Sequence, residues 1–218
     1  MAEKNVFQRL AAADQGMISD CMLRLGLGGW MDGIHAAGDA AVFAGPAKTV
    51  LVGPRRGVEG YAQSKYAIIA DMNAGEVLVV GGVETTENQI GGNVALFGQM
   101  QGLAAIVCGT PVRDREEMMA LKMPVFASAF TARMPVSTDT IAINVPVVCG
   151  GSQVRPGDAV VGSKDGVLVI PKSKLDDILF ELEEVEKIET ALQKAVRDGK
   201  TFKEIEALAG QKKKPRAR

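Results

Sequence analysis

The stretch EVLVVGGVETTENQIGGNVALFGQMQGLAAIVC, residues 76–108, decides the fold class. It opens with a short valine-rich run at 76–80 and closes with a second apolar run at 104–108. Between these runs, residues 92–101 form a helical segment that begins after a glycine pair. Two short apolar strands joined by a helix make a βαβ unit, in which the strands are parallel and the crossover is right-handed. The middle of the chain is therefore predicted to be a parallel α/β core.

The same alternation continues on both sides of this stretch. Before it, residues 47–52 are predicted to form a strand and residues 60–70 a helix. After it, residues 113–121 are predicted to form a helix and residues 125–127 a third buried strand. Two further helices are expected near the N-terminus, at residues 7–12 and 19–25.

The pattern changes from residue 141 onwards. Short apolar runs between 141 and 170 are separated by tight-turn pairs such as Gly150-Gly151 and Asp165-Gly166. Such turn pairs predict antiparallel hairpins rather than further βαβ units. Residues 175–197 then follow a three-four apolar repeat, which predicts a long amphipathic helix that ends before Gly199. A layered sheet with helices outside is expected, as one structural domain with a core at 1–171 and a helical extension at 172–218.

Composition excludes several classes of protein. The 218 residues carry a formal net charge of −1, so nothing draws the whole molecule to nucleic acid or to an anionic membrane. The basic tail at 212–218 is expected to be a solvated chain end. No apolar run approaches the roughly 20 residues that a membrane helix requires. Cys21, Cys108 and Cys149 lie among apolar neighbours and are expected to be buried free thiols, which predicts a cytoplasmic protein.

The chemistry is expected between Gly91 and Asp114. A helix that starts at Gly91-Gly92-Asn93-Val94 presents unpaired backbone N–H groups, which suit a carboxylate or a phosphate; a plain tight turn is the alternative. Arg113 and Asp114 follow the next strand, whose carboxyl end opens onto the same edge of the sheet. Arginine binds carboxylate or enolate oxygens, and aspartate binds Mg²⁺ or Mn²⁺. The alternative makes both residues the first turn of a surface helix.

The long C-terminal helix places a charge on its apolar stripe. Continuing the repeat from Val185 leads to Glu189, and a carboxylate is costly to bury without a partner. The alternative is that Ile188 takes the place on the stripe and Glu189 lies at its rim.

Other candidates are weaker. His35 is the only histidine, but no partner for it as a general base is identifiable. No lysine sits in an obviously dehydrated setting, which argues against a Schiff-base aldolase. Lys48, Arg133 and Lys164 are expected to be surface cations rather than substrate contacts. The motifs G-x-S-x-G, G-x-G-x-x-G and the Walker loop are all absent from the sequence.

The sequence resembles the RraA-like family over roughly residues 18 to 200. This family contains 4-hydroxy-4-methyl-2-oxoglutarate (HMG) and 4-carboxy-4-hydroxy-2-oxoadipate (CHA) aldolases, inhibitors of ribonuclease E, and proteins labelled as dimethylmenaquinone methyltransferases. The matching stretches are Ser19-Asp20, Gly45-Pro46-Ala47, Gly75-Glu76-Val77-Leu78-Val79-Val80, Gly91-Gly92-Asn93-Val94, Pro111-Val112-Arg113-Asp114, Pro124-Val125-Phe126, Val154-Arg155-Pro156-Gly157-Asp158 and Asp165-Gly166-Val167-Leu168-Val169-Ile170-Pro171.

The resemblance implies a layered β/β/α sandwich of the swivelling-domain type and a homotrimer or homohexamer. It implies that the amides of Gly91–Val94 bind the carboxylate of a pyruvyl group and that Arg113 contacts the substrate. It also implies that Asp114 binds the metal and that Glu189 completes the site of a neighbouring subunit.

The activity implied is that of a metal-dependent (class II) pyruvate aldolase, of the EC 4.1.3 type. Such an enzyme uses Mg²⁺, Mn²⁺ or another divalent cation to cleave a 4-hydroxy-2-oxo dicarboxylic acid, and it also decarboxylates oxaloacetate. Two alternatives remain: a non-catalytic regulator of a ribonuclease, or a lyase for a different 2-oxo or hydroxy acid.

The sequence departs from the aldolase pattern at two positions. The aldolases often carry an acidic residue directly after the first glycine, where it helps to hold metal-bound water, and here that residue is Gly92. The aspartate usual before the glycine of the second turn is replaced by Cys108. Both changes put the usual aldolase substrates in question.

Overall fold

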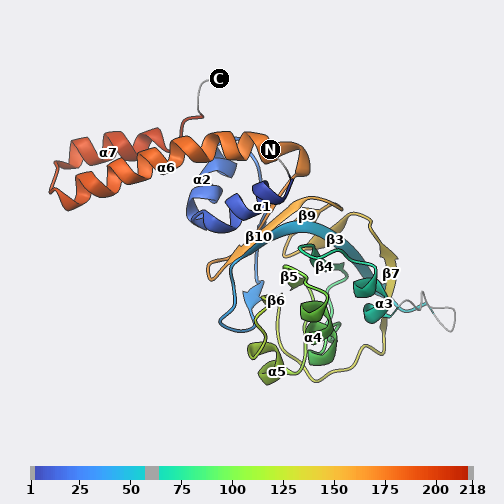
Figure 1. Cartoon of the computed structure of the whole chain (residues 1–218). Coiled ribbons are helices and arrows are strands. Elements are labelled where there is room, and N and C mark those ends of the chain that lie inside the picture. The colour runs from blue at the N-terminus through green and yellow to red at the C-terminus, as the bar shows by residue number, and fades with distance from the viewer. Residues whose placement is uncertain (1–2, 57–63, 216–218) are drawn as a thin grey trace. The chain divides into compact units, whose positions relative to one another are not determined.

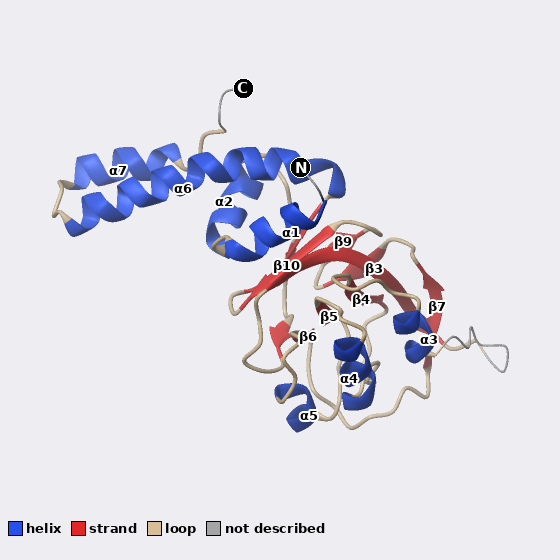
Figure 2. Cartoon of the chain, viewed as in Figure 1, coloured by secondary structure: helices blue, strands red, loops and turns tan. Residues whose placement is uncertain are grey.

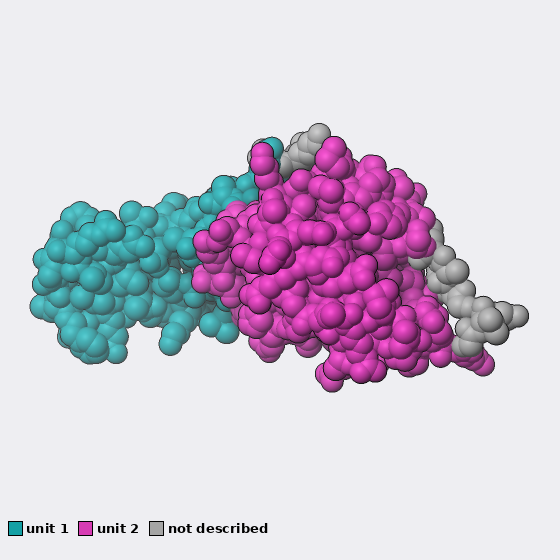
Figure 3. All heavy atoms as spheres, turned by 90° about the horizontal axis from the view of Figure 1, so that it is seen from below, with its two compact units in different colours: residues 1–28, 172–218 teal, residues 29–171 magenta. Residues whose placement is uncertain are grey.

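The computed structural model describes residues 3–56 and 64–215, with side chains from residue 6 onwards. The chain divides into two compact units, residues 1–28 together with 172–218, and residues 29–171 (Figure 3). One boundary between the units follows residue 171. The first 28 residues, however, group with the C-terminal helices and not with the α/β core, because their apolar side chains pack against the long C-terminal helix.

Four parallel strands form the centre of the larger unit (Figure 1). In order across the sheet they are β3 (Phe43–Pro54), β4 (Val77–Gly82), β5 (Ala105–Cys108) and β6 (Val125–Ala127). Their crossovers all run in one direction along the sheet, so right-handed connections place the crossover helices on one face. The parallel core predicted from the central stretch is confirmed.

Three helices cover that face (Figure 2). Their bounds are α3 (Lys65–Ala70), α4 (Gly92–Met100) and α5 (Arg115–Met119). They bury side chains such as Ile69 and Met118 against one face of the strands, where Leu78 and Ile106 point. The helix expected at 60–70 is observed from Lys65, and residues 60–63 lie outside the described residues. The helix expected at 113–121 is shorter, and it begins only after Asp114.

The remaining strands are antiparallel, as predicted for the region from residue 141 onwards, whereas β1 and β2 were not predicted. They are β1 (Trp30–Met31), β2 (His35–Ala36), β7 (Thr138–Ile143), β8 (Val147–Cys149), β9 (Ser152–Val154), β10 (Ala159–Ser163) and β11 (Gly166–Ile170). The sheet order is β1-β11-β10-β3-β4-β5-β6-β2, with β7 paired to β3 and with β8 and β9 paired to each other. A second core joins Val79 and Phe126, on the face away from the helices, to Val160 and Val169 of the antiparallel strands. The layered β/β/α fold is therefore confirmed.

The smaller unit is helical. It consists of α1 (Glu3–Ala12), α2 (Gln15–Arg24), the 3-10 turn η1 (Lys172–Lys174), α6 (Leu175–Arg197) and α7 (Phe202–Gln211). α2 packs on α6, and between them Arg24 Nε lies 2.9 Å from Glu181 Oε2 in an ion pair whose side chains are only 2% and 3% exposed. Helix α7 was not predicted, although the capping box of Thr201 and Glu204 marks its start. Among the described residues, no helix combines the length and the apolar character needed to cross a membrane.

All three cysteines are buried and free, as predicted. Burial raises the pKa of the Cys21 and Cys149 thiols to about 12, so neither is a thiolate at neutral pH.

Candidate active site

The two ends of the segment from Gly91 to Asp114 meet at the carboxyl edge of the parallel sheet. Beyond the ends of β4 and β5, Ile90 pairs in parallel with Val112, and Val112 pairs with Phe130. The backbone N–H of Arg113 donates to the carbonyl oxygen of Ile90 at 3.0 Å. These short pairings extend the order of the sheet and bring the start of α4 next to the Arg-Asp pair, as the strand order predicted.

Asp114 has an unusual backbone conformation at this point. Its φ of 62° and ψ of 55° lie in the left-handed region, where only one other described residue that is not glycine has a positive φ. Aspartate tolerates this region better than most residues, and such conformations concentrate at functional sites. The turn directs the carboxylate to α4, and Asp114 Oδ2 accepts a hydrogen bond from the backbone N–H of Gly92 at 2.9 Å. The same oxygen lies 3.4 Å from Arg113 Nε.

Only glycine fits at position 91 with this arrangement. A Cβ atom there would lie 2.9 Å from both Arg113 Nε and Asp114 Oδ2, which is closer than such contacts allow. Arg113 Nε is shielded from solvent and donates no hydrogen bond to any described residue. The N–H groups of Asn93 and Val94, in the first turn of α4, likewise have no acceptor among the described residues. Several donors thus converge where a carboxylate could bind.

Gly92 adjoins an acidic side chain that the sequence did not indicate. The carboxylate oxygen Oε2 of Glu117, on α5, lies 1.9 Å from the place where a Cβ atom of residue 92 would be. Gly92 is buried beneath it. The position that lacks an acid in the sequence therefore has one beside it in space.

A pocket of ≈ 400 Å³ opens beside the Arg-Asp pair, lined by Arg113, Asp114, Arg115, Phe130, Thr131 and Ala132. The guanidinium carbon of Arg115 lies 5.1 Å from the centre of the Phe130 ring. Arg115 forms no ion pair within the described part of the chain. Two arginines and one aspartate thus line the pocket, and this excess of positive charge favours an anionic ligand.

The donor set suits a hydrated Mg²⁺ ion. Oδ2 of Asp114 is held by Gly92, whereas Oδ1 has no hydrogen-bond partner among the described residues. Within those residues, no three acidic, histidine or cysteine side chains are grouped closely enough to enclose a metal. Mg²⁺ does not need such a group, because it commonly keeps several waters and binds through one or two carboxylates. Cys108 cannot take the place of the missing aspartate, because it is fully buried and burial raises the pKa of its thiol.

Comparison with known proteins gives the family. A family model described as Aldolase/RraA matches residues 16–169. The chain belongs to the RraA-like family. A putative 4-hydroxy-4-methyl-2-oxoglutarate aldolase of Halalkalibacterium halodurans is 32% identical over 152 residues, which cover 68% of this chain and 72% of that protein. A protein of Thermus thermophilus named 4-hydroxy-4-methyl-2-oxoglutarate aldolase is 30% identical over 136 residues, which cover 62% of this chain and 79% of its own.

Solved structures show the same RraA-like fold. RraAS2 of Streptomyces coelicolor, described as an unusual member of the RNase ES inhibitor RraA protein family, superimposes with a TM-score of 0.80. The match is 24% identical in sequence and covers 88% of this chain and 98% of that one. An uncharacterized protein of Pseudomonas syringae pv. tomato matches with a TM-score of 0.79 at 21% identity, over 93% of this chain and 97% of its own. At these identities the likeness concerns the fold.

Glu189 lies at the rim of the apolar stripe of α6 in this RraA-like protein. Ile188 is buried on the stripe, as the alternative interpretation held, and the Glu189 side chain is 19% exposed. Glu189 Oε2 lies 2.7 Å from Lys212 Nζ, and Gln193 donates to its other oxygen. These bonds from Lys212 and Gln193 lower the pKa of the Glu189 carboxyl, which keeps it ionised.

The expectation of a solvated basic tail is wrong for Lys212, which forms two ion pairs. Its ammonium also lies 2.8 Å from Asp20 Oδ2, so two carboxylates hold it at the end of α7. Residues 213–215 of the basic tail are exposed, as expected, and residues 216–218 lie outside the described residues.

The other candidate residues do not line the Asp114 pocket. His35 is exposed in strand β2. Lys48 is buried, and its ammonium lies 2.8 Å from Asp71 Oδ2, so the expectation of a surface cation is wrong for this residue. Lys164 is exposed, as expected. Arg133 is exposed and lines a different pocket, of ≈ 510 Å³, beside Glu84 and Glu87.

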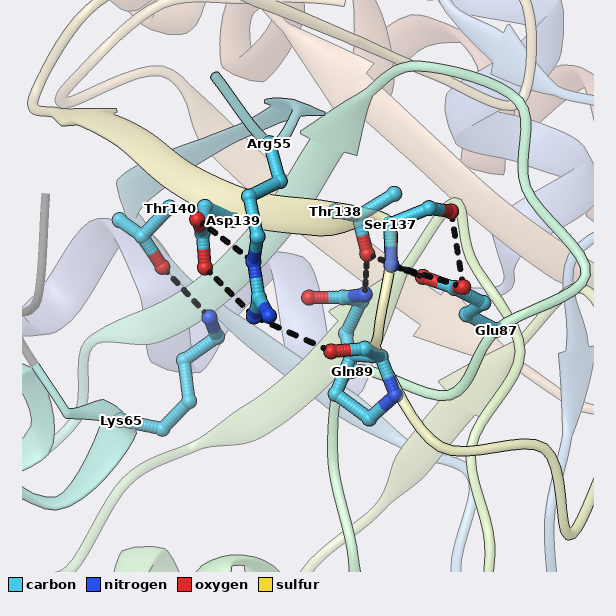
Figure 4. A network of polar contacts seen from close by, with 9 residues as sticks. Arg55, Lys65, Glu87, Gln89, Ser137, Thr138, Asp139 and Thr140 are labelled. Atoms are coloured by element: carbon cyan, nitrogen blue, oxygen red, sulfur yellow. Dashed lines mark hydrogen bonds and ion pairs between the residues drawn. The ribbon is translucent and has the colours of Figure 1, made fainter. Parts of the chain in front are cut away.

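A polar network lies beside that second pocket (Figure 4). Lys65, on α3, donates to Thr140 Oγ1 at 2.6 Å, and burial lowers the pKa of its ammonium. The expectation that no lysine is dehydrated is therefore wrong for Lys65. It does not belong to the Asp114 pocket, and its hydroxyl partner comes from β7.

Glu87 is the buried acid of this network and is 1% exposed. Ser137 donates to it from both backbone N–H and hydroxyl, and the Thr138 hydroxyl donates at 2.8 Å (Figure 4). Burial opposes ionisation, but these hydrogen bonds outweigh it and hold the pKa of Glu87 at about 2.

We predict that Glu87 makes the protein sensitive to acid. A carboxyl whose pKa is about 2 when folded, against the ordinary 4.5, stabilises the folded state above pH 4.5 and loses that contribution as the pH falls towards 2. The difference in free energy of unfolding between wild type and Glu87→Gln should be largest above pH 4.5 and should shrink towards pH 2. Urea unfolding at a series of pH values measures it, and a difference that does not change with pH would contradict the assignment.

Proposed function

We propose that this protein is a divalent-metal-dependent lyase that cleaves a 4-hydroxy-2-oxo dicarboxylic acid and releases pyruvate. The observation that carries the proposal is the hydrogen bond between the Asp114 carboxylate and the N–H of Gly92, which holds an acid of the pocket lining against the start of α4. The aldolase names of the relatives in Halalkalibacterium and Thermus support the same reaction class. Oxaloacetate decarboxylation is expected as a second activity, because it passes through the same pyruvate enolate.

Different residues of the site would bind different groups of the substrate. The free N–H groups of Asn93 and Val94 and the guanidinium of Arg113 would bind the carboxylate and keto oxygens of the 2-oxo acid. Arg115, which lines the same pocket, would bind the second carboxylate. Donors fixed before the substrate arrives stabilise an enolate without having to reorganise.

Asp114 would hold the cation, either Mg²⁺ or Mn²⁺, through its free oxygen Oδ1. When bound, the cation would supply Lewis-acid stabilisation of the negative charge that develops on the keto oxygen. The hydrogen bond from Gly92 fixes the direction of the carboxylate, and Arg113 offsets part of its charge at 3.4 Å.

A complete site is proposed to need a second copy of the chain. Glu189 would enter the pocket of a neighbouring subunit in a trimer or hexamer and would act there as an ionised carboxylate, directly or through water, on the 4-hydroxyl proton. Closed cyclic symmetry would give every pocket one such carboxylate.

The deciding experiment is pyruvate release from HMG, CHA and oxaloacetate by the purified protein with Mg²⁺ or Mn²⁺. A lyase for another 2-oxo acid would appear in a wider screen of substrates. No release from any of them, with no affinity for either cation, would favour a non-catalytic regulator of the ribonuclease-inhibitor kind.

Asp114→Asn is predicted to lower pyruvate release by about 100-fold or more, because it removes the charge that holds the cation. Asparagine also tolerates the left-handed conformation, so the fold should be retained. Steady-state kinetics and thermal unfolding measure the two effects. Asp165→Asn, in an exposed turn, is the control and should behave as wild type. Equal activity of both variants would contradict the metal role of Asp114.

Arg115→Gln is predicted to weaken the binding of substrates that have two carboxylates. KM for oxaloacetate should rise by about 10-fold or more, as expected for the loss of a hydrogen bond to a charged group. Binding of pyruvate, which has one carboxylate, should stay within about twofold of wild type. Titration calorimetry and kinetics test this, with Arg133→Gln in the other pocket as control. An equal loss of affinity for oxaloacetate and pyruvate would show that Arg115 does not bind the second carboxylate.

Glu189→Gln and Asp114→Asn are predicted to be inactive alone and partly active together. When the two variants are co-expressed, some interfaces combine an intact Asp114 of one chain with an intact Glu189 of the next. Activity above that of either variant would support a shared site. Mixed oligomers with no such recovery would place Glu189 outside the site.

A further inference from the structure

We propose that Glu117 supplies the second carboxylate of the cation site at Asp114. The inference rests on the proposed function, since it concerns the same site, but it assigns a residue that no sequence pattern indicated. Asp114 alone is one acidic side chain for this site, and Glu117 is a second acid that lies against Gly92.

A side chain at residue 92 and the Glu117 carboxylate would occupy the same space. Oε2 of Glu117 lies 1.9 Å, and its Cβ 2.9 Å, from the place of a Cβ at position 92. Neither separation is possible between real atoms. A side chain at position 92 and the observed Glu117 conformation therefore exclude each other, and glycine at 92 makes room for the carboxylate.

The Glu117 side chain does not point in the direction that is common for a glutamate at its position in α5. Asp114 is the N-cap of the helix, so Glu117 is its third residue, where a glutamate commonly folds back to the N-cap backbone N–H. Glu117 makes no such bond. Its carboxylate extends instead to the start of α4, and it has no hydrogen bond or ion pair with any described residue.

Two carboxylates therefore reach the same residue. Asp114 Oδ2 lies 2.9 Å from the N atom of Gly92, and Glu117 Oε2 lies against its Cα side. Carboxylate oxygens that reach one residue from two side chains are ligands of the kind that a divalent cation prefers. Among the described residues, Arg113 is the cation paired with Asp114, and none is paired with Glu117. A hydrated divalent ion would satisfy both, since Mg²⁺ binds through one or two carboxylates and retained waters.

The chain also offers a matched control. Glu116 precedes Glu117 in the same turn, is likewise exposed, and carries the same charge, but it makes no contact with the missing Cβ of Gly92. Any effect of net charge on cation affinity should be equal for the two residues. An effect of position should appear at Glu117 alone.

The test measures Mn²⁺ affinity of the full-length protein by electron paramagnetic resonance and calorimetry, without substrate. Glu117→Gln should weaken Mn²⁺ binding by about 10- to 100-fold, the usual cost of losing a partner of a metal site, whereas Glu116→Gln should stay within about twofold. The exchange variant Gly92→Asp/Glu117→Gly moves the acid to the other residue. It has glycine at 117 because even an alanine Cβ there would lie 2.9 Å from the new Cβ. It should bind Mn²⁺ at least about 10-fold more tightly than Glu117→Gly.

Each outcome decides a different question. Wild type that binds Mn²⁺ while Glu117→Gln and Glu116→Gln bind equally well would overturn this inference and leave the proposed function intact. Wild type that does not bind Mn²⁺ and releases no pyruvate would overturn both. Thermal unfolding identifies a variant that fails to fold, in which case the exchange variant and its glycine background are compared with each other alone.

Discussion

The site depends on one hydrogen bond, from the N–H of Gly92 to Asp114 Oδ2. It joins the start of α4 to the turn before α5, two points that are separated by 22 residues and by a strand crossover. It requires the left-handed turn at Asp114 and the absence of a side chain at Gly91. The parallel strands place these segments at one edge, and this bond sets which atoms of Asp114 remain free.

The fold could be read from the sequence because its signals are local. The apolar runs of β4 and β5 and the turn at Asp165-Gly166 give strand type and pairing from neighbouring residues alone. The meeting of Gly91 with Arg113 followed from strand order. The left-handed conformation of Asp114 did not, because aspartate occupies that region only where the surroundings impose it.

Long-range partners account for what the sequence did not give. Lys65 is dehydrated by segments from other parts of the chain, and Lys48 is held by Asp71, 23 residues away. Lys212 belongs to a tail whose composition indicated free solvation, yet Asp20 and Glu189 bind it. In each case the sequence shows the charged residue but not the distant residues that surround or pair with it. The apolar repeat of α6 likewise left open whether Ile188 or Glu189 faced inward, a choice that packing made in favour of the isoleucine.

The departure at Gly92 shows why a missing motif residue does not mean a missing group. A motif records positions along the chain, whereas a ligand site needs atoms at positions in space. Glu117 occupies the volume that a side chain at 92 would need, so an acid at 92 and the observed conformation of Glu117 exclude each other. An acid at position 92 would therefore be expected to accompany a small or outward-directed residue at 117. Gly92 and Glu117 are best understood as one structural feature, in which the glycine makes the room that the glutamate uses.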